Sequence, residues 1–317
     1  MSIQNSYDLH EKNSWNSTGA SDIEQKIAAW KRRDTADYWR HQRKYNNLMP
    51  LIKNDPKATW LTVGDGRYGS DVRFLEENNI DALATDISTE ILKDAKDSGY
   101  IKKYEKANAE KLHFPDESFD YVLCKESYHH FPRPMVALAE MLRVAKKAAL
   151  LIEPQDQDIF TRERIRKFPA KDMLWRAFVN YVRVMFLKKS PIAVIGEVNR
   201  DDFHPAYEDI GNYVYEISKP ELLKVCYGQN FDAIAFREMN DHYIKGGEYE
   251  VANDSSALFR NLKKEIEEMN ARCESGRQNY DYLIAFLFKK MPEQALIDDL
   301  NKAGFVFKKL TKNPHWK

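Results

Sequence analysis

The stretch TVGDGRYG, residues 62–69, follows an apolar segment at 59–63 and leads into an amphipathic segment at 70–77. This pattern predicts a buried strand, a glycine-rich turn and a helix. Glycines in such a turn let the backbone approach a bound ligand closely. The same spacing serves dinucleotide-binding enzymes, so the turn alone does not name the ligand.

Strand and helix patterns alternate on the C-terminal side of this turn. Further strands are predicted at 82–86, near 104–107, at 119–124 and at 148–153, with helices at 89–98 and 134–144. Such alternation implies a parallel sheet covered by helices on both faces. We therefore expect an α/β fold with a doubly wound, mostly parallel sheet.

The segments around this core divide the chain further. Residues before about 20 are polar and predict an arm that is mobile unless other parts of the chain tie it down. Ser21 and Glu24 have the spacing of a capping box for a helix that continues through Tyr45. Long helical patterns replace the strand–helix rhythm after Pro154, and strand patterns return at 233–237 and 280–288 with a helix near 258–269 and a helix–strand unit at 292–310. We predict an N-terminal arm and helical cap at 1–50, an α/β core at 51–155, a helical insertion or substrate lid after the fifth strand at 156–230, and C-terminal strands completing the sheet at 231–317.

Composition restricts the classes of partner. Basic and acidic residues balance at 49 each, which disfavours sequence-independent binding of nucleic acid. The three cysteines lie far apart without a Cys-x-x-Cys pair, so neither a zinc site nor a disulfide framework is predicted. The most apolar run, 173–187, is interrupted by polar residues and too short to span a bilayer. With no signal-peptide core at the polar N-terminus, we expect a cytoplasmic protein without a transmembrane segment.

Asp86 is the first candidate ligand-binding side chain outside the glycine turn. It ends the second predicted strand, where a carboxylate can accept two hydrogen bonds from a ribose diol. The alternative is a helix N-cap for the stretch that begins near Ser88. The two interpretations are compatible, and we favour the ribose. Turn and carboxylate together still fit either a nicotinamide dinucleotide or S-adenosylmethionine.

A third group of segments separates these two ligands. The segments are Asn108-Ala109-Glu110, the run at 112–122, the run KESYHHFPRP at 125–134 and Glu140 to Val144. In order and spacing they closely resemble the motifs of class I, Rossmann-like S-adenosylmethionine-dependent methyltransferases. The resemblance covers roughly Trp60 to Pro154 and argues against a nicotinamide oxidoreductase.

The resemblance implies a cofactor site for S-adenosylmethionine made of Val63, Gly64, Asp65, Gly66, Gly69, Asp86, Ile87, Asn108, Ala109, Glu110, Lys125 and Glu126. The glycine turn passes beneath the methionine part of the cofactor. Asp86 holds the ribose hydroxyls, with Ile87 beside the adenine and residues 108–109 at the adenine edge. Residues 125–126 line the side of the sulfonium.

The chain departs from the family pattern in two places. Thr62 stands where the family usually has an acidic residue, and the third glycine is Gly69, one position later than usual. The methionine amino group therefore needs another partner, and the alternatives are Asp65 and a residue of the N-terminal helix. A catalytically silent cofactor-binding protein is the alternative function that Thr62 supports.

Methyl transfer to a hydroxyl benefits from a general base, which histidine supplies near neutral pH. His129 and His130 follow the fourth strand of the core, at the edge where open α/β sheets bind ligands. Either histidine could instead only pack the loop, and of the two we favour His130 as the base. His204, in the insertion, is a further candidate. None of the histidines and aspartates shows metal-ligand spacing on one element, so no metal is predicted.

The insertion offers three interpretations. Basic residues cluster before and after its apolar stretch, at 162–171 and 183–189. It predicts a buried lid or homodimer helix, a cap whose arginines hold a phosphate or carboxylate of an anionic acceptor, or a helix resting on a membrane surface. The basic N-terminal helix either closes over the cofactor or presents a solvated face.

The function predicted from the sequence is methyl transfer from S-adenosylmethionine to a small or medium-sized acceptor. A hydroxyl of a sugar, a nucleotide-sugar or another metabolite is the acceptor we favour. An RNA or protein methyltransferase is the main alternative, which the neutral net charge disfavours.

Overall fold

The computed structural model describes residues 3–13, 20–157 and 213–315, and single residues at 178, 181, 185 and 207. The strands are β1 (Thr59–Val63), β2 (Asp81–Asp86), β3 (Tyr104–Lys106), β4 (Phe119–Lys125), β5 (Ala145–Pro154), β6 (Ala233–Met239), β7 (Tyr282–Phe288) and β8 (Val306–Lys309). The α-helices are α1 (Ile3–Asn13), α2 (Ala20–Lys31), α3 (Ala36–Tyr45), α4 (Met49–Asn54), α5 (Ser70–Glu77), α6 (Glu90–Asp97), α7 (Pro134–Val144), α10 (Lys219–Gly228), α11 (Ala257–Glu274) and α12 (Gln294–Lys302), with 3₁₀ turns η1 (Asn46–Leu48) and η2 (Tyr128–His130). Most of the predicted insertion, His204 included, lies outside the described residues.

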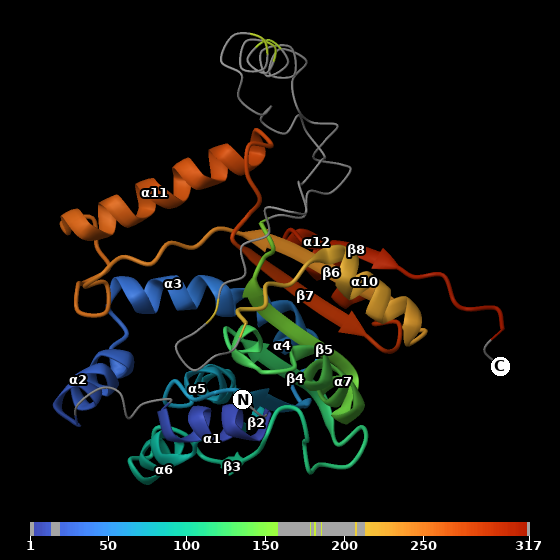
Figure 1. The fold of residues 1–317 in the computed structure, drawn as a ribbon, viewed down its shortest axis with the longest axis horizontal. Coiled ribbons are helices and arrows are strands. Elements are labelled where there is room, and N and C mark those ends of the chain that lie inside the picture. Colours follow the sequence, from blue (N-terminus) through green and yellow to red (C-terminus); the bar gives the residue numbers. More distant parts are fainter. Residues whose placement is uncertain are drawn as a thin grey trace.

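One sheet organises the chain (Figure 1). Its strand order is β3-β2-β1-β4-β5-β7-β6-β8. The first five strands in this order are mutually parallel, whereas β7 is antiparallel to both β5 and β6, and β8 is antiparallel to β6. The predicted doubly wound, mostly parallel α/β fold is confirmed.

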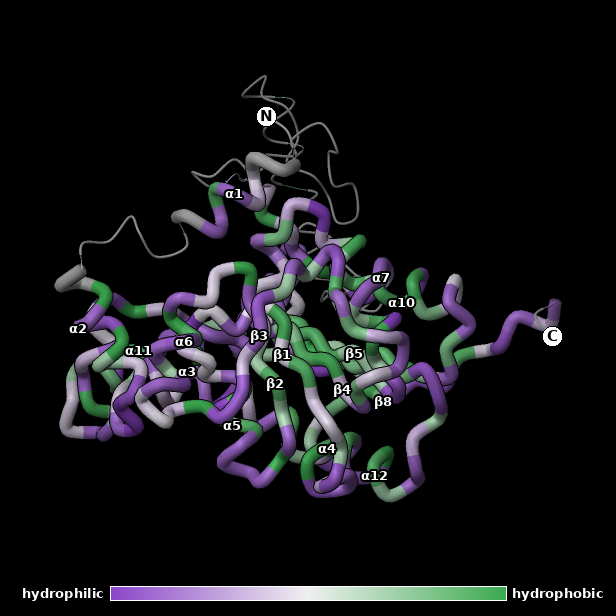
Figure 2. Tube along the Cα trace, turned by 90° about the horizontal axis from the view of Figure 1, so that it is seen from below, coloured by the Kyte–Doolittle hydropathy of each residue, from purple (hydrophilic) through white to green (hydrophobic). Residues whose placement is uncertain are grey.

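Successive strand residues face opposite sides of the sheet, and each side has its own core. Trp60 packs on the side covered by α4, α5, α6 and α12, and its neighbour Leu61 packs on the side covered by α7 and α10. Figure 2 shows the hydrophobic segments gathered in the central strands and the hydrophilic ones around them. Because both faces are covered, the sheet edge at the strands' carboxyl ends is where a ligand can reach the backbone.

The helix predicted to run from Ser21 through Tyr45 is broken between α2 and α3. Thr35 caps α3, since its Oγ1 accepts a hydrogen bond from the Tyr38 amide at 3.1 Å. Thr35 also pairs with Val251, and the Ala252 amide donates to the Asp34 carbonyl at 2.7 Å. The long-range pairing with residues near 250 therefore sets the break, at a residue type that favours N-caps.

Residues 3–13 of the predicted arm form α1, which other parts of the chain tie down. The Tyr7 hydroxyl donates to Glu110 Oε2 at 2.6 Å and receives a hydrogen bond from Arg133 Nη2 at 2.8 Å. Lys106 forms an ion pair with Glu11. Polar side chains of the N-terminus thus find partners on loops that follow β3 and η2.

Lys44 fastens α3 to the sheet. Its ammonium is fully buried and lies 2.7 Å from Asp241 Oδ2, in the segment after β6, and in ion-pair contact with Glu126, just after β4. Farther from the sheet, Ala36 of α3 packs with Phe259, Leu262 and Ile266 of α11. The helix α3 is therefore held on one side by charge and on the other by apolar contacts.

Replacing Lys44 by methionine should be strongly destabilising. The substitution keeps most of the apolar stem but leaves two carboxylates without their shared cation, which costs about 3–5 kcal/mol for a broken buried pair. Urea denaturation measures the free energy of unfolding. The matched control is Lys93→Met, which breaks the exposed pair with Asp97 on α6 and should leave stability unchanged. Equal stability of the two variants would refute the anchoring role of Lys44.

Candidate active site

The strand order reverses between β1 and β4, because the chain winds outward from β1 in one direction and from β4 in the other. Ligands of open α/β sheets bind outside the carboxyl ends of the strands at such a switch point. A cavity of about 1000 Å³ lies at this place. Its lining includes these residues predicted from the sequence: Gly64, Asp65, Gly66, Asp86, Ile87, Asn108, Ala109, Glu110, Lys125, Glu126, His129 and His130.

Val63 and Gly69, also predicted for the cofactor, do not line the cavity. Val63 is buried in the core that α7 covers. Gly69 has φ +67°, and a Cβ added there would lie 2.9 Å from Cγ2 of Ile101. Packing against Ile101 therefore requires glycine at position 69, directly before α5. This explains why the third glycine of the turn stands one position later than usual.

The other two glycines of the turn are enforced by close neighbours. A Cβ on Gly64, where φ is +78°, would lie 2.5 Å from Cβ of Ser127, and a Cβ on Gly66 would lie 2.8 Å from Oδ2 of Asp86. The Ser127 hydroxyl donates to the Gly64 carbonyl oxygen at 2.6 Å. The loops after β1, β2 and β4 consequently form one continuous wall of the cavity.

Asp86 is held by backbone donors. Its Oδ1 accepts a hydrogen bond from the Ser88 amide at 2.8 Å, and the amides of Gly66 and Ile87 also donate to the carboxylate. The helix α6 begins later, with Thr89 at its N-cap position, so the alternative N-cap role of Asp86 is wrong. Burial raises the pKa of the Asp86 carboxyl to about 6, against the lowering effect of the amides.

Glu110 has a structural role in this wall. Its carboxylate accepts hydrogen bonds from the backbone amide of Arg133 at 2.7 Å and from Arg133 Nε at 2.6 Å, as well as from Tyr7. It thereby places α1, with Tyr7 and His10, along the cavity. The sequence prediction placed Glu110 at the cofactor but missed α1.

Asp65 explains the threonine at position 62. The Asp71 amide donates to Oδ1 of Asp65 at 3.0 Å, and the Val72 amide and the Thr62 hydroxyl donate to Oδ2 at 2.9 Å each. Asp65 thus caps the first turn of α5. Burial and the nearby Asp71 carboxylate raise its pKa well above the ordinary value.

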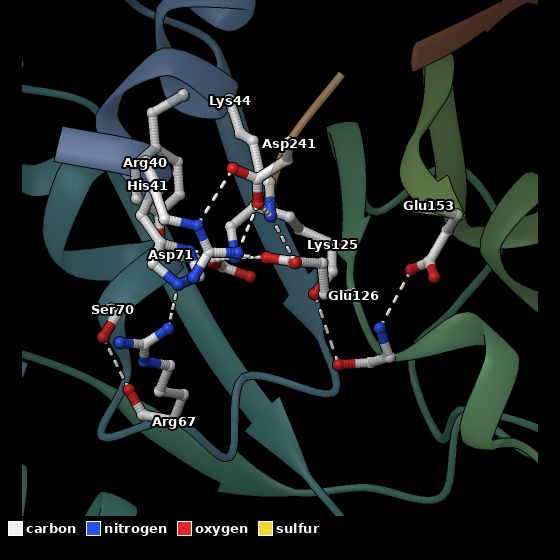
Figure 3. Close-up of polar contacts among 12 residues, drawn as sticks. Arg40, His41, Lys44, Arg67, Ser70, Asp71, Lys125, Glu126, Glu153 and Asp241 are labelled. Atoms are coloured by element: carbon white, nitrogen blue, oxygen red, sulfur yellow. Dashed lines mark hydrogen bonds and ion pairs between the residues drawn. The ribbon is translucent and has the colours of Figure 1, made fainter. Parts of the chain in front are cut away.

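Charged side chains from four parts of the chain meet beside the cavity (Figure 3). We call them the α3–β4 ion cluster: Asp37, Arg40, His41, Lys44, Arg67, Asp71, Lys125, Glu126 and Asp241. Lys125 Nζ lies 3.2 Å from Asp71 Oδ1 and 3.1 Å from Glu126 Oε2. Arg40 and Lys44 are buried, so the α3 charges do not form a solvated face.

Glu126 joins this cluster to the sheet. The Tyr282 hydroxyl of β7 donates to its Oε1 at 2.7 Å. Burial raises the pKa of Glu126, but Lys44, Lys125 and His41 outweigh burial and hold the pKa well below its usual range. The residue adopts φ +55°, a left-handed conformation that is uncommon outside glycine and tends to occur at functional sites.

A buried carboxylate that the sequence prediction missed orients His129. Glu153, at the end of β5, is fully buried, and its Oε1 accepts hydrogen bonds from the amides of Ser127 at 2.9 Å and Tyr128 at 3.0 Å. Its Oε2 lies 2.7 Å from Nδ1 of His129. The rings of His129 and His130 are 4.0 Å apart. The adjacent parallel strands β4 and β5 bring residues 129 and 153 together.

Further lining residues come from α2 and from segments in the C-terminal part of the chain. Tyr243 and Glu248 follow β6, Tyr282 begins β7, and Trp30 ends α2. Among the described residues, no helix is long and apolar enough to cross a membrane. The same residues contain no group of three or more His, Cys, Asp and Glu side chains able to hold a metal ion.

Comparison with known proteins matches this site to a family. Residues 61–152 match the family model described as methyltransferase domain. A curated protein of Aspergillus luteorubrus, named probable methyltransferase ltbC, is 32% identical over 149 residues, which make up 42% of this chain and 47% of that protein. The chain therefore spans about half the length of the curated relative it matches.

Solved structures show weaker likeness. A methyltransferase dependent on S-adenosylmethionine from Archaeoglobus fulgidus has 12% identity and a TM-score of 0.44, covering 78% of this chain and 93% of that one. Magnesium protoporphyrin IX methyltransferase from Synechocystis PCC 6803, with bound S-adenosylhomocysteine, has 10% identity and a TM-score of 0.45, covering 90% and 98%.

The match to residues 61–152 falls on the part of the sheet that forms the switch point and its cavity. These residues are a methyltransferase domain. This domain forms the α/β core of the chain, between β1 and β5.

A substitution at Gly64 tests the close contact between the loops that follow β1 and β4. Gly64→Ala places a methyl group against Ser127 in a left-handed conformation, whereas Gly99→Ala has a similar φ of +72° with nothing within 4 Å. We expect Gly99→Ala to lose about 1–2 kcal/mol from φ alone, and Gly64→Ala about 1–3 kcal/mol more from overpacking. Denaturant unfolding of both variants measures the difference, and equal losses would contradict the close contact.

Proposed function

We propose that this chain methylates a hydroxyl group of a small or medium-sized acceptor, such as a sugar, a nucleotide-sugar or another metabolite. The observation that carries the proposal is the pair His129–Glu153 on the wall of the cofactor cavity. A hydroxyl must lose its proton as it becomes a nucleophile, and a histidine held by a buried carboxylate is suited to accept that proton.

The residues along the cavity fit S-adenosylmethionine, which we propose as the cofactor. Asp86 offers a carboxylate that can accept both ribose hydroxyl groups, and residues 108–109 follow β3, on the side where the adenine would lie. The turn with Gly64 and Gly66 also lines the cavity, where its backbone can approach a ligand. When bound, S-adenosylmethionine supplies a methyl carbon on a positively charged sulfur, which an acceptor atom can displace in line.

Each residue of the pair has a distinct role. Glu153 holds the Nδ1 side of His129 and so sets the tautomer in which Nε2 carries the lone pair. That nitrogen accepts the hydroxyl proton, and Glu153 stabilises the imidazolium that results. Such a base contributes roughly 10²- to 10⁴-fold to turnover.

Between the two neighbouring histidines, we assign the base to His129. The sequence prediction favoured His130, but the contact with Glu153 belongs to His129. His130 also lines the cavity, and its ring lies 4.0 Å from that of His129. His204 lies outside the described residues.

Binding of S-adenosylhomocysteine should depend on pH through Asp86. The ionised carboxylate accepts two hydroxyl hydrogen bonds, and protonation removes one acceptor. Because the pKa is raised to about 6, the dissociation constant should increase as pH falls through this value, and stay level above it. Calorimetry at pH 5–8 measures this dependence. Asp86→Ala should weaken binding about 10- to 100-fold at neutral pH, whereas the exposed control Asp97→Ala should not, and an unchanged affinity in Asp86→Ala would remove Asp86 from the ribose.

The base assignment is tested by turnover. Wild-type protein is incubated with S-adenosylmethionine and a panel of monosaccharides, nucleotide-sugars and phenols, and S-adenosylhomocysteine release is measured by mass spectrometry. On the best acceptor, His129→Gln and Glu153→Gln should lower kcat roughly 10²- to 10⁴-fold with little change in S-adenosylhomocysteine affinity. His113→Gln, an exposed histidine paired with Glu105, is the control. Unchanged kcat in His129→Gln, or methylation confined to RNA, protein or amine acceptors, would overturn the proposal.

A further inference from the structure

The amino-acid end of the cofactor lacks its usual acidic partner on the glycine turn. Thr62 occupies that position, and its hydroxyl is engaged with Asp65. Asp65 in turn accepts two amides of α5. Both side chains are therefore already engaged in fixing the turn to α5.

The next charged residue along the turn is Arg67. Its guanidinium forms an ion pair with Asp37 of α3, contacts Nε2 of His41, and lies 5.5 Å over the ring of Trp30. All four residues line the cavity. The Arg67 side chain is 29% exposed, in contrast to the buried Lys44 and Lys125 of the same cluster at 0% and 4%. Arg67 is thus the cation of the cluster that solvent, and a ligand, can reach.

The protonation state of His41 affects the net charge beside Arg67. Burial, followed by the positive charge of Arg67, lowers the pKa of His41 well below its ordinary value. A neutral imidazole can accept a hydrogen bond from Arg67 without adding a second positive charge. Arg67, the most exposed cation of the cluster, therefore lies beside the carboxylate of Asp37 where both line the cavity.

The order of the strands indicates which part of the cofactor would lie beside Arg67 and Asp37. Adenine and the methionine sulfur are attached to opposite ends of the ribose. Residues 108–109, on the adenine side, follow β3. Lys125 ends β4 and Glu126 follows it, and the strands β2 and β1 lie between β3 and β4 in the sheet. His41 connects the pair to Glu126, with Nδ1 3.4 Å from Glu126 Oε2. Arg67 and Asp37 thus lie on the β4 side, with the methionine part.

We propose that Arg67 and Asp37 form the subsite for the α-amino-acid group of S-adenosylmethionine. Arg67 binds the carboxylate through its fork of N–H donors, and Asp37 accepts hydrogen bonds from the ammonium group. The pair takes over the function of the acid that Thr62 replaces. The proposal rests on S-adenosylmethionine as cofactor, and it makes α3, which precedes the matched residues 61–152, part of the cofactor site.

A purely structural ion pair is the competing explanation. In that case Arg67 and Asp37 would only fasten α3 to the turn, as Lys44 and Asp241 fasten it to the sheet (Figure 3). The two explanations differ in what they predict for ligands with and without the amino-acid group. A fastening role affects all ligands alike, and a subsite affects only those that carry the group.

The test uses calorimetry with three ligands: S-adenosylhomocysteine, its decarboxylated analogue 5′-(3-aminopropylthio)-5′-deoxyadenosine, and 5′-methylthioadenosine, which lacks the whole amino-acid group. Arg67→Gln should weaken S-adenosylhomocysteine about 10- to 100-fold and leave the other two within about twofold. Asp37→Asn should weaken both ligands that carry the amine and spare 5′-methylthioadenosine. Arg67→Lys should recover part of the loss.

Arg33→Gln is the matched control, because Arg33 pairs with Glu77 close to the start of α3 but does not line the cavity. It should bind all three ligands as the wild type does. Equal weakening of all three ligands by Arg67→Gln, or none, would overturn the subsite; thermal unfolding of each variant shows whether α3 has been lost. If wild-type protein binds neither S-adenosylhomocysteine nor 5′-methylthioadenosine, the cofactor assignment itself fails.

Discussion

The carboxylate of Glu126 is the constraint on which the arrangement of α3, β4 and β7 beside the cavity depends. It stays ionised although it is partly buried, because the positive charges of Lys44 and Lys125 hold its pKa well below the usual range. These partners come from α3 and from β4 itself, and Tyr282 adds a hydrogen bond from β7. One charge thus holds together elements that share no sequence proximity. Removing it would leave two lysines buried against fewer counter-charges, which is costly in a medium of low polarity.

Because α3 is held there, it can take part in the site rather than merely cover it. Lys44 and Asp241 lie on the buried side of the α3–β4 ion cluster, and Arg67 on the side reached from the cavity. The same arrangement separates two tasks within one cluster: anchoring the helix, and presenting a cation and an anion to a ligand. The separation follows from exposure, since a charge that must exchange partners cannot be fully buried.

The His129–Glu153 pair on the wall of the cavity is positioned in a different way. Glu153 ends β5, and its carboxylate gathers the amides of the loop after β4 before it reaches His129. Those amides fix the carboxylate, and the carboxylate fixes the imidazole. A base held in this way loses little orientational freedom when an acceptor binds. The proposed chemistry therefore depends on two adjacent parallel strands ending at the same edge of the sheet.

The sequence by itself determined the fold class and predicted the cofactor. Both depend on segments that lie in order between Trp60 and Pro154, and local patterns of period and glycine spacing are readable without a structure. The same reasoning failed at α1 and at the break before α3, because contacts with Glu110 and with residues near 250 decide those places. It also mistook Gly69 for a ligand position, since the contact with Ile101 is invisible along the chain.

Only the tertiary structure decided which side chains work together. The pairs His129–Glu153, Arg67–Asp37 and Arg40–Asp241 join residues whose separations along the chain follow no helical or strand period. Their meeting depends on sheet order and on where α3 docks. A carboxylate at the end of an apolar strand looks like a strand boundary in the sequence, and it becomes a partner for a base only when the neighbouring strand is known.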